Sequence, residues 1–165
     1  VNIDFSPHVI EKMRTASMKA GRDKMIWLEM DMLKMTFDNC VFDVVIDKAT
    51  MDAIMVDEGD VWHPKDECKV QAHQLCEGVS RVLKQNGYFL QISFAQPHFR
   101  SKYLMGYVHE SSCSSFTRVQ ELQEGISIYD SQKGRCEMYG WDVDFLQLEV
   151  EEGSLSSLLY IAQKF

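Results

Sequence analysis

The sequence lacks a Cys-X-X-Cys pair, a long apolar run and an excess of basic residues. Its cysteines number five, and an odd count argues for reduced, intracellular thiols rather than a disulfide framework. No apolar stretch approaches the roughly 20 residues of a membrane-spanning helix. No signal peptide is visible at the start of the sequence. We therefore expect a cytoplasmic protein.

The charge balance is acidic, with a net charge of −8. Nucleic acid and anionic lipid repel such a chain at long range, so we expect neither a nucleic-acid partner nor a membrane partner. Hydrophobic residues make up 45% of the 165 positions, which suits a single domain over residues 1–165 with a packed core. Val1 already resembles the interior of a strand, and we expect the natural protein to extend further toward its N-terminus.

Strand-like and helix-like segments alternate along the chain. Ser6 and Pro7 mark a helix start, because serine caps free N–H groups and proline tolerates the first helical position. Alternation predicts an α/β fold that has a parallel sheet with helices on both faces. The predicted strands are 1–4, 25–30, 42–46 and 88–94, and the predicted helices are 7–20, 65–84 and 97–108.

Two of these segments carry more specific expectations. The FDVVI run at 42–46 is apolar and β-branched, which is typical of a strand buried on both faces. Gly87 is expected to supply a left-handed turn after the helix at 65–84. That helix has one apolar stripe, formed by Cys68, Ala72, Cys76, Val79 and Leu83.

The C-terminal part has the pattern of a β-hairpin. Residues 141–150 and 155–164 alternate apolar and polar side chains on either side of a Glu-Glu-Gly-Ser connection. This pattern predicts an antiparallel pair and one edge strand that runs backwards. Residues 109–136 fit neither a clear helix nor a clear strand, and we interpret them as an insertion.

Three predicted strands end in an aspartate, namely Asp4, Asp31 and Asp47. Ligands of parallel α/β sheets bind beyond the carboxyl ends of the strands. A carboxylate there accepts hydrogen bonds from ribose hydroxyls, which suits Asp4, while Asp31 suits the amine of an adenine. An aspartate after a strand also often starts a turn or caps a helix. Three in register favour a nucleoside site, with Asp47 near the reactive end of the ligand.

Four sequence blocks resemble the class I, seven-β-strand methyltransferases: VNIDFSPHVIEKM, WLEMDMLKMTF, FDVVIDKATMDAI and EGVSRVLKQNGYFLQISFAQPHFR. Within this family, the DKATMDAI and AQPHFR blocks are most similar to the branch that methylates lysines of translation elongation factor one-alpha. The resemblance implies a Rossmann-like sheet with a C-terminal antiparallel hairpin and S-adenosylmethionine as cofactor. It also implies methyl transfer to a lysine of a protein substrate such as elongation factor one-alpha.

The resemblance also implies roles for individual residues. Asp47 and Lys48 match the segment beside the methyl donor and acceptor, and Asp47 is the candidate carboxylate that orients the lysine amine and helps it lose a proton. The matched cofactor-binding residues are Asp4, Phe5, Met30, Asp31, Met32 and Asp47. Aromatic faces favour a cationic amine, and core packing is the alternative role for such side chains. The candidates for the wall of the acceptor channel are Phe94, Phe99 and Tyr103.

The family's first strand and its acidic, glycine-rich loop precede the VNIDFS block, and the sequence starts without them. We therefore expect weak cofactor binding by the chain alone. A catalytically inactive, truncated methyltransferase-like binding module is the alternative function. A dinucleotide-dependent oxidoreductase is a third, which the hairpin and the FDVVIDK block disfavour.

Two further patterns carry little weight. His98 follows Pro97, where we expect it to cap a helix, with contact to the substrate as the alternative. Four residues suggest a zinc site, but their spacing matches no common structural zinc pattern, so we predict no metal. These residues are His63, Cys68, His73 and Cys76.

Overall fold

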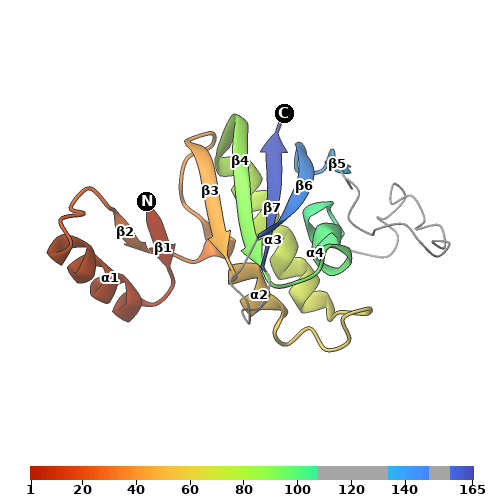
Figure 1. Ribbon diagram of the computed structural model, residues 1–165, viewed down its shortest axis with the longest axis horizontal. Coiled ribbons are helices and arrows are strands. Elements are labelled where there is room, and N and C mark those ends of the chain that lie inside the picture. Colours follow the sequence, from red (N-terminus) through yellow and green to blue (C-terminus); the bar gives the residue numbers. More distant parts are fainter. Residues whose placement is uncertain (108–133, 149–156) are drawn as a thin grey trace. The chain divides into compact units, whose positions relative to one another are not determined.

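The computed structural model describes residues 1–107, 134–148 and 157–165. The chain divides into two compact units, Val1–Asp38 and Asn39–Phe165, each with its own strands (Figure 1). No helix in the described part of the chain is both long enough and apolar enough to cross a membrane.

The unit Val1–Asp38 is a strand–helix–strand motif. Strands β1 (Asn2–Asp4) and β2 (Trp27–Glu29) pair in parallel, with Asp4 opposite Glu29. Helix α1 (Pro7–Lys19) begins after Ser6, whose side chain accepts a hydrogen bond from the backbone N–H of Val9. The predicted helix start is therefore confirmed. A short 3-10 helix, η1 (Met32–Lys34), follows β2.

The unit Asn39–Phe165 contains a mixed sheet, whose described strands lie in the order β3-β4-β7-β6-β5 (Figure 1). Strand β3 runs parallel to β4, and β7 runs antiparallel to both β4 and β6. The predicted antiparallel pair is confirmed, but β7 lies inside the sheet rather than at its edge. The strands are β3 (Phe42–Lys48), β4 (Leu83–Ser93), β5 (Gly134–Cys136), β6 (Trp141–Leu148) and β7 (Ser157–Lys164).

Three helices accompany this sheet in the described residues: α2 (Thr50–Met55), α3 (Asp66–Val82) and α4 (Pro97–Leu104). Helix α3 contacts both α2 and α4, so the three form one layer. The predicted apolar stripe is confirmed, because its five residues are all buried, although the last of them, Leu83, already belongs to β4. The sequence analysis missed α2, which is a short helix directly after β3.

The helical layer covers one face of β3 and β4. Phe89 and Gln91 of β4 are buried beneath it. On the opposite face, Val44 is 46% exposed and Ile46 is 67% exposed. The prediction that residues 42–46 are buried on both faces is therefore wrong. The reason is that β3 is an edge strand, and the described helices share one side of the sheet.

Gly87 does not form a left-handed turn after α3. Strand β4 begins directly at Leu83, and the left-handed residue is Asn86, with a φ of 63°. A Cβ atom on Gly87 would lie 2.9 Å from the carbonyl oxygen of Lys84 and 3.0 Å from that of Asp43. The absence of a side chain therefore permits a close backbone approach between β4 and β3.

Two other predictions are affected by the described boundaries. Most of the predicted insertion at 109–136 lies outside the described residues, and its last three residues form β5. Helix α4 ends at Leu104, before the predicted end at 108. Its N-cap is Gln96 and no side chain caps it, so the expected capping by His98 is wrong.

Candidate functional site

In the unit Val1–Asp38, two of the three predicted aspartates lie at the carboxyl ends of neighbouring strands. Asp4 ends β1, and its backbone carbonyl accepts a hydrogen bond of 2.9 Å from the N–H of Met30. Asp31 follows β2 and caps η1, because its Oδ1 accepts from the N–H of Leu33 at 2.9 Å. The unit thus brings together Asp4 and the segment Met30–Asp31–Met32.

This pair of strand ends has the donors and acceptors that a nucleoside needs. Asp4 accepts through Oδ1 from the N–H of Ser6 at 2.8 Å, while its Oδ2 has no hydrogen-bond partner within the described ranges. The backbone N–H of Met32 opens η1, and the first N–H groups of a helix lack a partner inside that helix. The side chain of Phe5 is exposed next to Asp4. The residues present therefore fit a ribose and an adenine.

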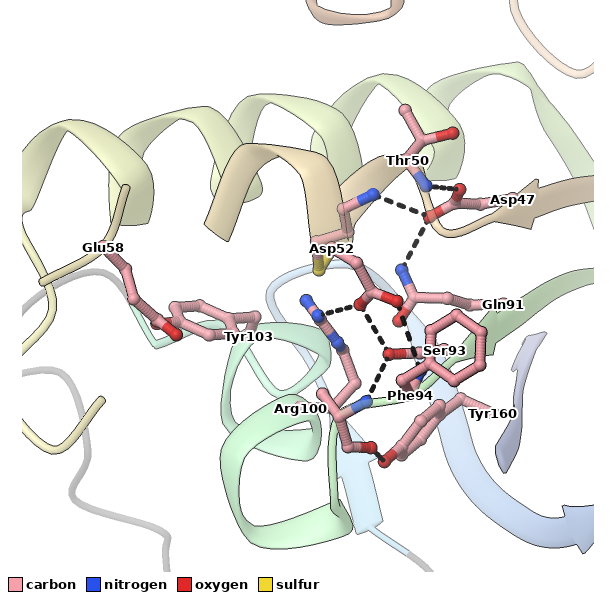
Figure 2. Close-up of polar contacts among 12 residues, drawn as sticks. Asp47, Thr50, Asp52, Glu58, Gln91, Ser93, Phe94, Arg100, Tyr103 and Tyr160 are labelled. Atoms are coloured by element: carbon pink, nitrogen blue, oxygen red, sulfur yellow. Dashed lines mark hydrogen bonds and ion pairs between the residues drawn. The ribbon is translucent and has the colours of Figure 1, made fainter. Parts of the chain in front are cut away.

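In the unit Asn39–Phe165, Asp47 lies in β3 one residue before its end and is only 5% exposed. Its carboxylate accepts three hydrogen bonds, drawn in Figure 2. The backbone N–H groups of Thr50 and Met51 donate to it at 2.7 and 3.3 Å, and Nε2 of Gln91 donates at 2.8 Å. Asp47 thus holds the start of α2 against β4. Lys48, the other predicted catalytic residue, is exposed.

A second carboxylate, that of Asp52 in α2, joins three elements. It accepts from the Ser93 hydroxyl at 2.6 Å, from the backbone N–H of Phe94 at 3.2 Å, and from the guanidinium of Arg100 (Figure 2). Arg100 is 2% exposed, and its Nε and Nη1 atoms are buried without a partner in the part of the chain that the structure describes. This network fixes α2 against α4 and the end of β4.

A cavity of about 300 Å³ lies between these same elements. It brings together the three aromatic residues predicted from the sequence, Phe94, Phe99 and Tyr103. The Tyr103 hydroxyl donates to Oε2 of Glu58 at 3.3 Å. Burial, followed by the nearby Glu58 carboxylate, raises the pKa of the Tyr103 phenol well above its ordinary value. The remaining lining residues are Asp52, Met55, Val56, Glu58, Ala95 and Arg100.

The cavity can hold a cationic or neutral amine. Asp52 and Glu58 provide two carboxylates, and the rings of Phe94, Phe99 and Tyr103 provide apolar walls. Aromatic faces and carboxylates both attract an ammonium group. Oε1 of Glu58 has no hydrogen-bond partner within the described residues, so it is the acceptor available to an amine.

Comparison with known proteins identifies the family. A family model described as a methyltransferase domain matches residues 1–153. The chain belongs to this methyltransferase family. The resemblance to class I methyltransferases predicted from the sequence blocks is therefore confirmed.

Curated relatives are about a third identical to this methyltransferase domain over the part of the chain that aligns with them. The human eEF1A lysine and N-terminal methyltransferase is 38% identical over 102 residues, which are 62% of the chain and 14% of that protein. The bovine EEF1A lysine methyltransferase 4 is 34% identical over 102 residues, which are 62% of the chain and 39% of that protein. The chain thus spans well under half the length of these relatives.

A solved structure supports the fold of the methyltransferase domain. A SAM-dependent methyltransferase from Methanosarcina mazei superimposes with a TM-score of 0.55 at 19% sequence identity. The match covers 98% of this chain and 80% of that chain. The α/β, Rossmann-like architecture is therefore that of class I methyltransferases.

The sequence analysis missed the three charged residues that line the cavity of the methyltransferase domain: Asp52, Glu58 and Arg100. Asp52 and Arg100 lie within the DKATMDAI and AQPHFR blocks, so the signal was present. Nothing in the sequence indicated that a short helix turns Asp52 toward Arg100, which is 48 residues away. Glu58 lies in a loop after α2 and carried no pattern of its own.

The residues weighed for zinc have other contacts. Nδ1 of His73 lies 2.8 Å from the Tyr139 hydroxyl, and Nδ1 of His63 lies 3.3 Å from Oδ2 of Asp60. Cys68 and Cys76 are buried in the α3 stripe. Among the described residues, no three His, Cys, Asp or Glu side chains are grouped so as to hold a metal ion.

Proposed function

We propose that this domain belongs to an S-adenosylmethionine-dependent methyltransferase that methylates a lysine side chain of a protein. The observation that carries the proposal is the cavity of the unit Asn39–Phe165. It combines two carboxylates with three aromatic rings in a volume of about 300 Å³, which suits one long amine-bearing side chain. The names of the curated relatives support elongation factor one-alpha as the protein substrate.

Glu58 is the proposed partner of the lysine amine. The amine must be neutral to attack a methyl group, and a carboxylate at the amine can orient it and accept its proton. Oε2 of Glu58 is held by the Tyr103 hydroxyl, which leaves Oε1 for the substrate. Asp52 is already paired with Arg100, so it contributes rigid geometry rather than net negative charge.

Phe94, Phe99 and Tyr103 are proposed to line the path of the lysine stem. Their rings border the same cavity as Glu58. Apolar walls pack against the methylene groups of the stem and exclude water from the amine. Much of the rate enhancement then comes from holding the nucleophile in one orientation.

The unit Val1–Asp38 is proposed to bind the nucleoside part of S-adenosylmethionine. The free Oδ2 of Asp4 would accept from a ribose hydroxyl, and Asp31 with the Met32 N–H would recognise the adenine. Phe5 and Met30 would pack beside them. When bound, the cofactor supplies a methyl group on a sulfonium, which the neutral amine accepts.

Asp47 and Lys48 are proposed to lie beside the reacting groups. The three hydrogen bonds of Asp47 support a role in which its carboxylate holds the start of α2, and through α2 the position of Asp52. A direct contact between Asp47 and the amine is the alternative role, which the Asp47→Asn variant tests.

The test incubates the purified full-length protein with tritiated S-adenosylmethionine and elongation factor one-alpha. We expect label in the substrate, on a lysine located by mass spectrometry. Glu58→Gln should lower kcat by about a hundredfold with an unchanged cofactor Kd. The matched control is Asp57→Asn, which makes the same charge change at an exposed neighbour outside the cavity. Cofactor binding without label in any lysine would instead favour a binding module.

A further inference from the structure

An exposed apolar surface adjoins the cavity. Five residues form this surface, which we call the aromatic rim: Val56, Trp62, Phe94, His98 and Phe99. Val56, Phe94 and Phe99 line the cavity itself. Trp62 is 67% exposed, and its ring lies 5.1 Å from that of Phe99, edge to face, and 6.0 Å from that of His98, stacked. The apolar surface therefore continues from the cavity to Trp62 without a gap.

The loop that presents Trp62 is held in place. The backbone N–H of Trp62 donates to Oδ1 of Asp60 at 2.9 Å, and Gly59 forms a β-bridge with Pro64. Nζ of Lys102 in α4 donates to the carbonyl oxygen of Val61 at 3.1 Å. A rim that is ordered in advance loses little conformational entropy when a partner binds, which favours its use as a docking surface.

The charges around the rim are mostly negative. Residues 52–67 contain six acidic side chains, at positions 52, 57, 58, 60, 66 and 67, against one lysine, at position 65. Lys69, Arg100 and Lys102 add three basic groups nearby, and the six carboxylates still outnumber the four basic groups. A basic partner segment is therefore complementary to this surface, whereas nucleic acid or an anionic membrane is repelled.

We infer that the aromatic rim binds an apolar side chain next to the acceptor lysine, within a basic segment of the protein substrate. The inference rests on the proposed function, because the cavity then takes the lysine itself. The acceptor lysine would enter the cavity, whose volume is about 300 Å³, and the side chains beside it in the substrate would meet the exposed residues around the mouth. There, Val56, Trp62 and Phe94 are the most exposed apolar side chains. Trp62 and Phe94 are aromatic, and exposed aromatics of this kind dominate binding at protein interfaces.

The test compares how the full-length protein binds and methylates two short synthetic peptides. Both contain one lysine and two arginines, and the lysine is flanked by leucines in the first peptide and by serines in the second. Fluorescence anisotropy gives the Kd of each labelled peptide, and methylation with tritiated S-adenosylmethionine gives KM and kcat. We expect the leucine peptide to bind about tenfold more tightly. Trp62→Ala should remove this preference, with the cofactor Kd unchanged.

The control variant is Leu146→Ala, which truncates a residue of β6 with 54% exposure outside the cavity and the rim. It should leave both peptide affinities as they are. Equal affinities of the two peptides, or a leucine preference that survives in Trp62→Ala, would overturn the inference. The inference would also be overturned if Leu146→Ala lost the leucine preference to the same extent as Trp62→Ala.

The two readouts separate this inference from the proposed function. A leucine preference that depends on Trp62, in a protein that methylates neither peptide, would support the rim as a docking surface and reject lysine methylation of such segments. Methylation of both peptides with equal KM would support the lysine chemistry and reject the rim.

Discussion

The guanidinium of Arg100 and the carboxylate of Asp52 form an ion pair that ties α4 to α2 beside the cavity of about 300 Å³. The Arg100 side chain is 2% exposed and that of Asp52 is 21% exposed. The pair is thus shielded on one side and open to the cavity on the other. It supplies the cavity with a carboxylate of fixed direction, which is the arrangement a positioned amine requires.

Replacing Arg100 by Met should destabilise the fold. The change leaves Asp52 without its cation, and breaking a buried pair by removing one partner costs roughly 3–5 kcal/mol. We expect a value of about 3 kcal/mol, because Asp52 is partly exposed and keeps its bonds to Ser93 and Phe94. Chemical unfolding of both proteins measures the difference. A change under about 1 kcal/mol would show that the pair behaves like a surface ion pair.

Asp47→Asn tests the predicted catalytic carboxylate. The amide loses one acceptor and turns an NH₂ group toward the N–H groups of Thr50 or Met51, so we expect a loss of about 1–3 kcal/mol in unfolding free energy. Methylation should be abolished while the cofactor Kd stays nearly unchanged. Turnover and stability are measured on the same preparation. Undiminished turnover would remove Asp47 from the reaction.

Asp4→Ala should weaken binding of S-adenosylmethionine by about 10- to 100-fold, because hydrogen bonds to a charged carboxylate contribute roughly 1.5–3 kcal/mol each. Titration calorimetry on the full-length protein gives the Kd. Asp23→Ala, at an exposed loop position of the same unit, is the control and should have no effect. An unchanged Kd for Asp4→Ala would exclude the proposed ribose contact.

Part of this site is predictable from the sequence. Asp4 and Asp31 follow from the rule that ligands of parallel sheets bind beyond the carboxyl ends of the strands. The structure pairs the two strands that precede them in parallel. Phe94, Phe99 and Tyr103 were suggested by resemblance, and they line one cavity. Glu58 and Arg100 were missed, because their roles depend on how α2 and α4 pack over the sheet. Such contacts join residues more than 40 positions apart and leave no local pattern.

The buried tyrosines predict how the fold responds to alkali. Burial raises the pKa of the phenols of Tyr103, Tyr139 and Tyr160 above the ordinary value near 10. Their protonated forms are favoured in the folded state, so their contribution to stability is complete below pH 10 and is lost as the pH rises above it. We expect the tyrosinate absorbance of these three residues to appear together with unfolding. A stepwise titration near pH 10 in the folded protein would contradict their burial.

Substitutions at Gly87 and Asn86 test whether close packing or backbone conformation matters more for the stability of this turn. Gly87→Ala forces a methyl group against the carbonyl oxygens of Lys84 and Asp43, where the contacts would be 2.9 and 3.0 Å. Overpacking of this kind costs about 1–3 kcal/mol, and here the neighbours are backbone atoms that cannot rotate away. Asn86→Gly retains the φ of 63° without strain and should change stability by less than about 0.5 kcal/mol. Chemical unfolding of the two variants measures both values. A larger loss of stability in Asn86→Gly than in Gly87→Ala would mean that the turn conformation at Asn86 matters more than the close approach of β4 to β3 at Gly87.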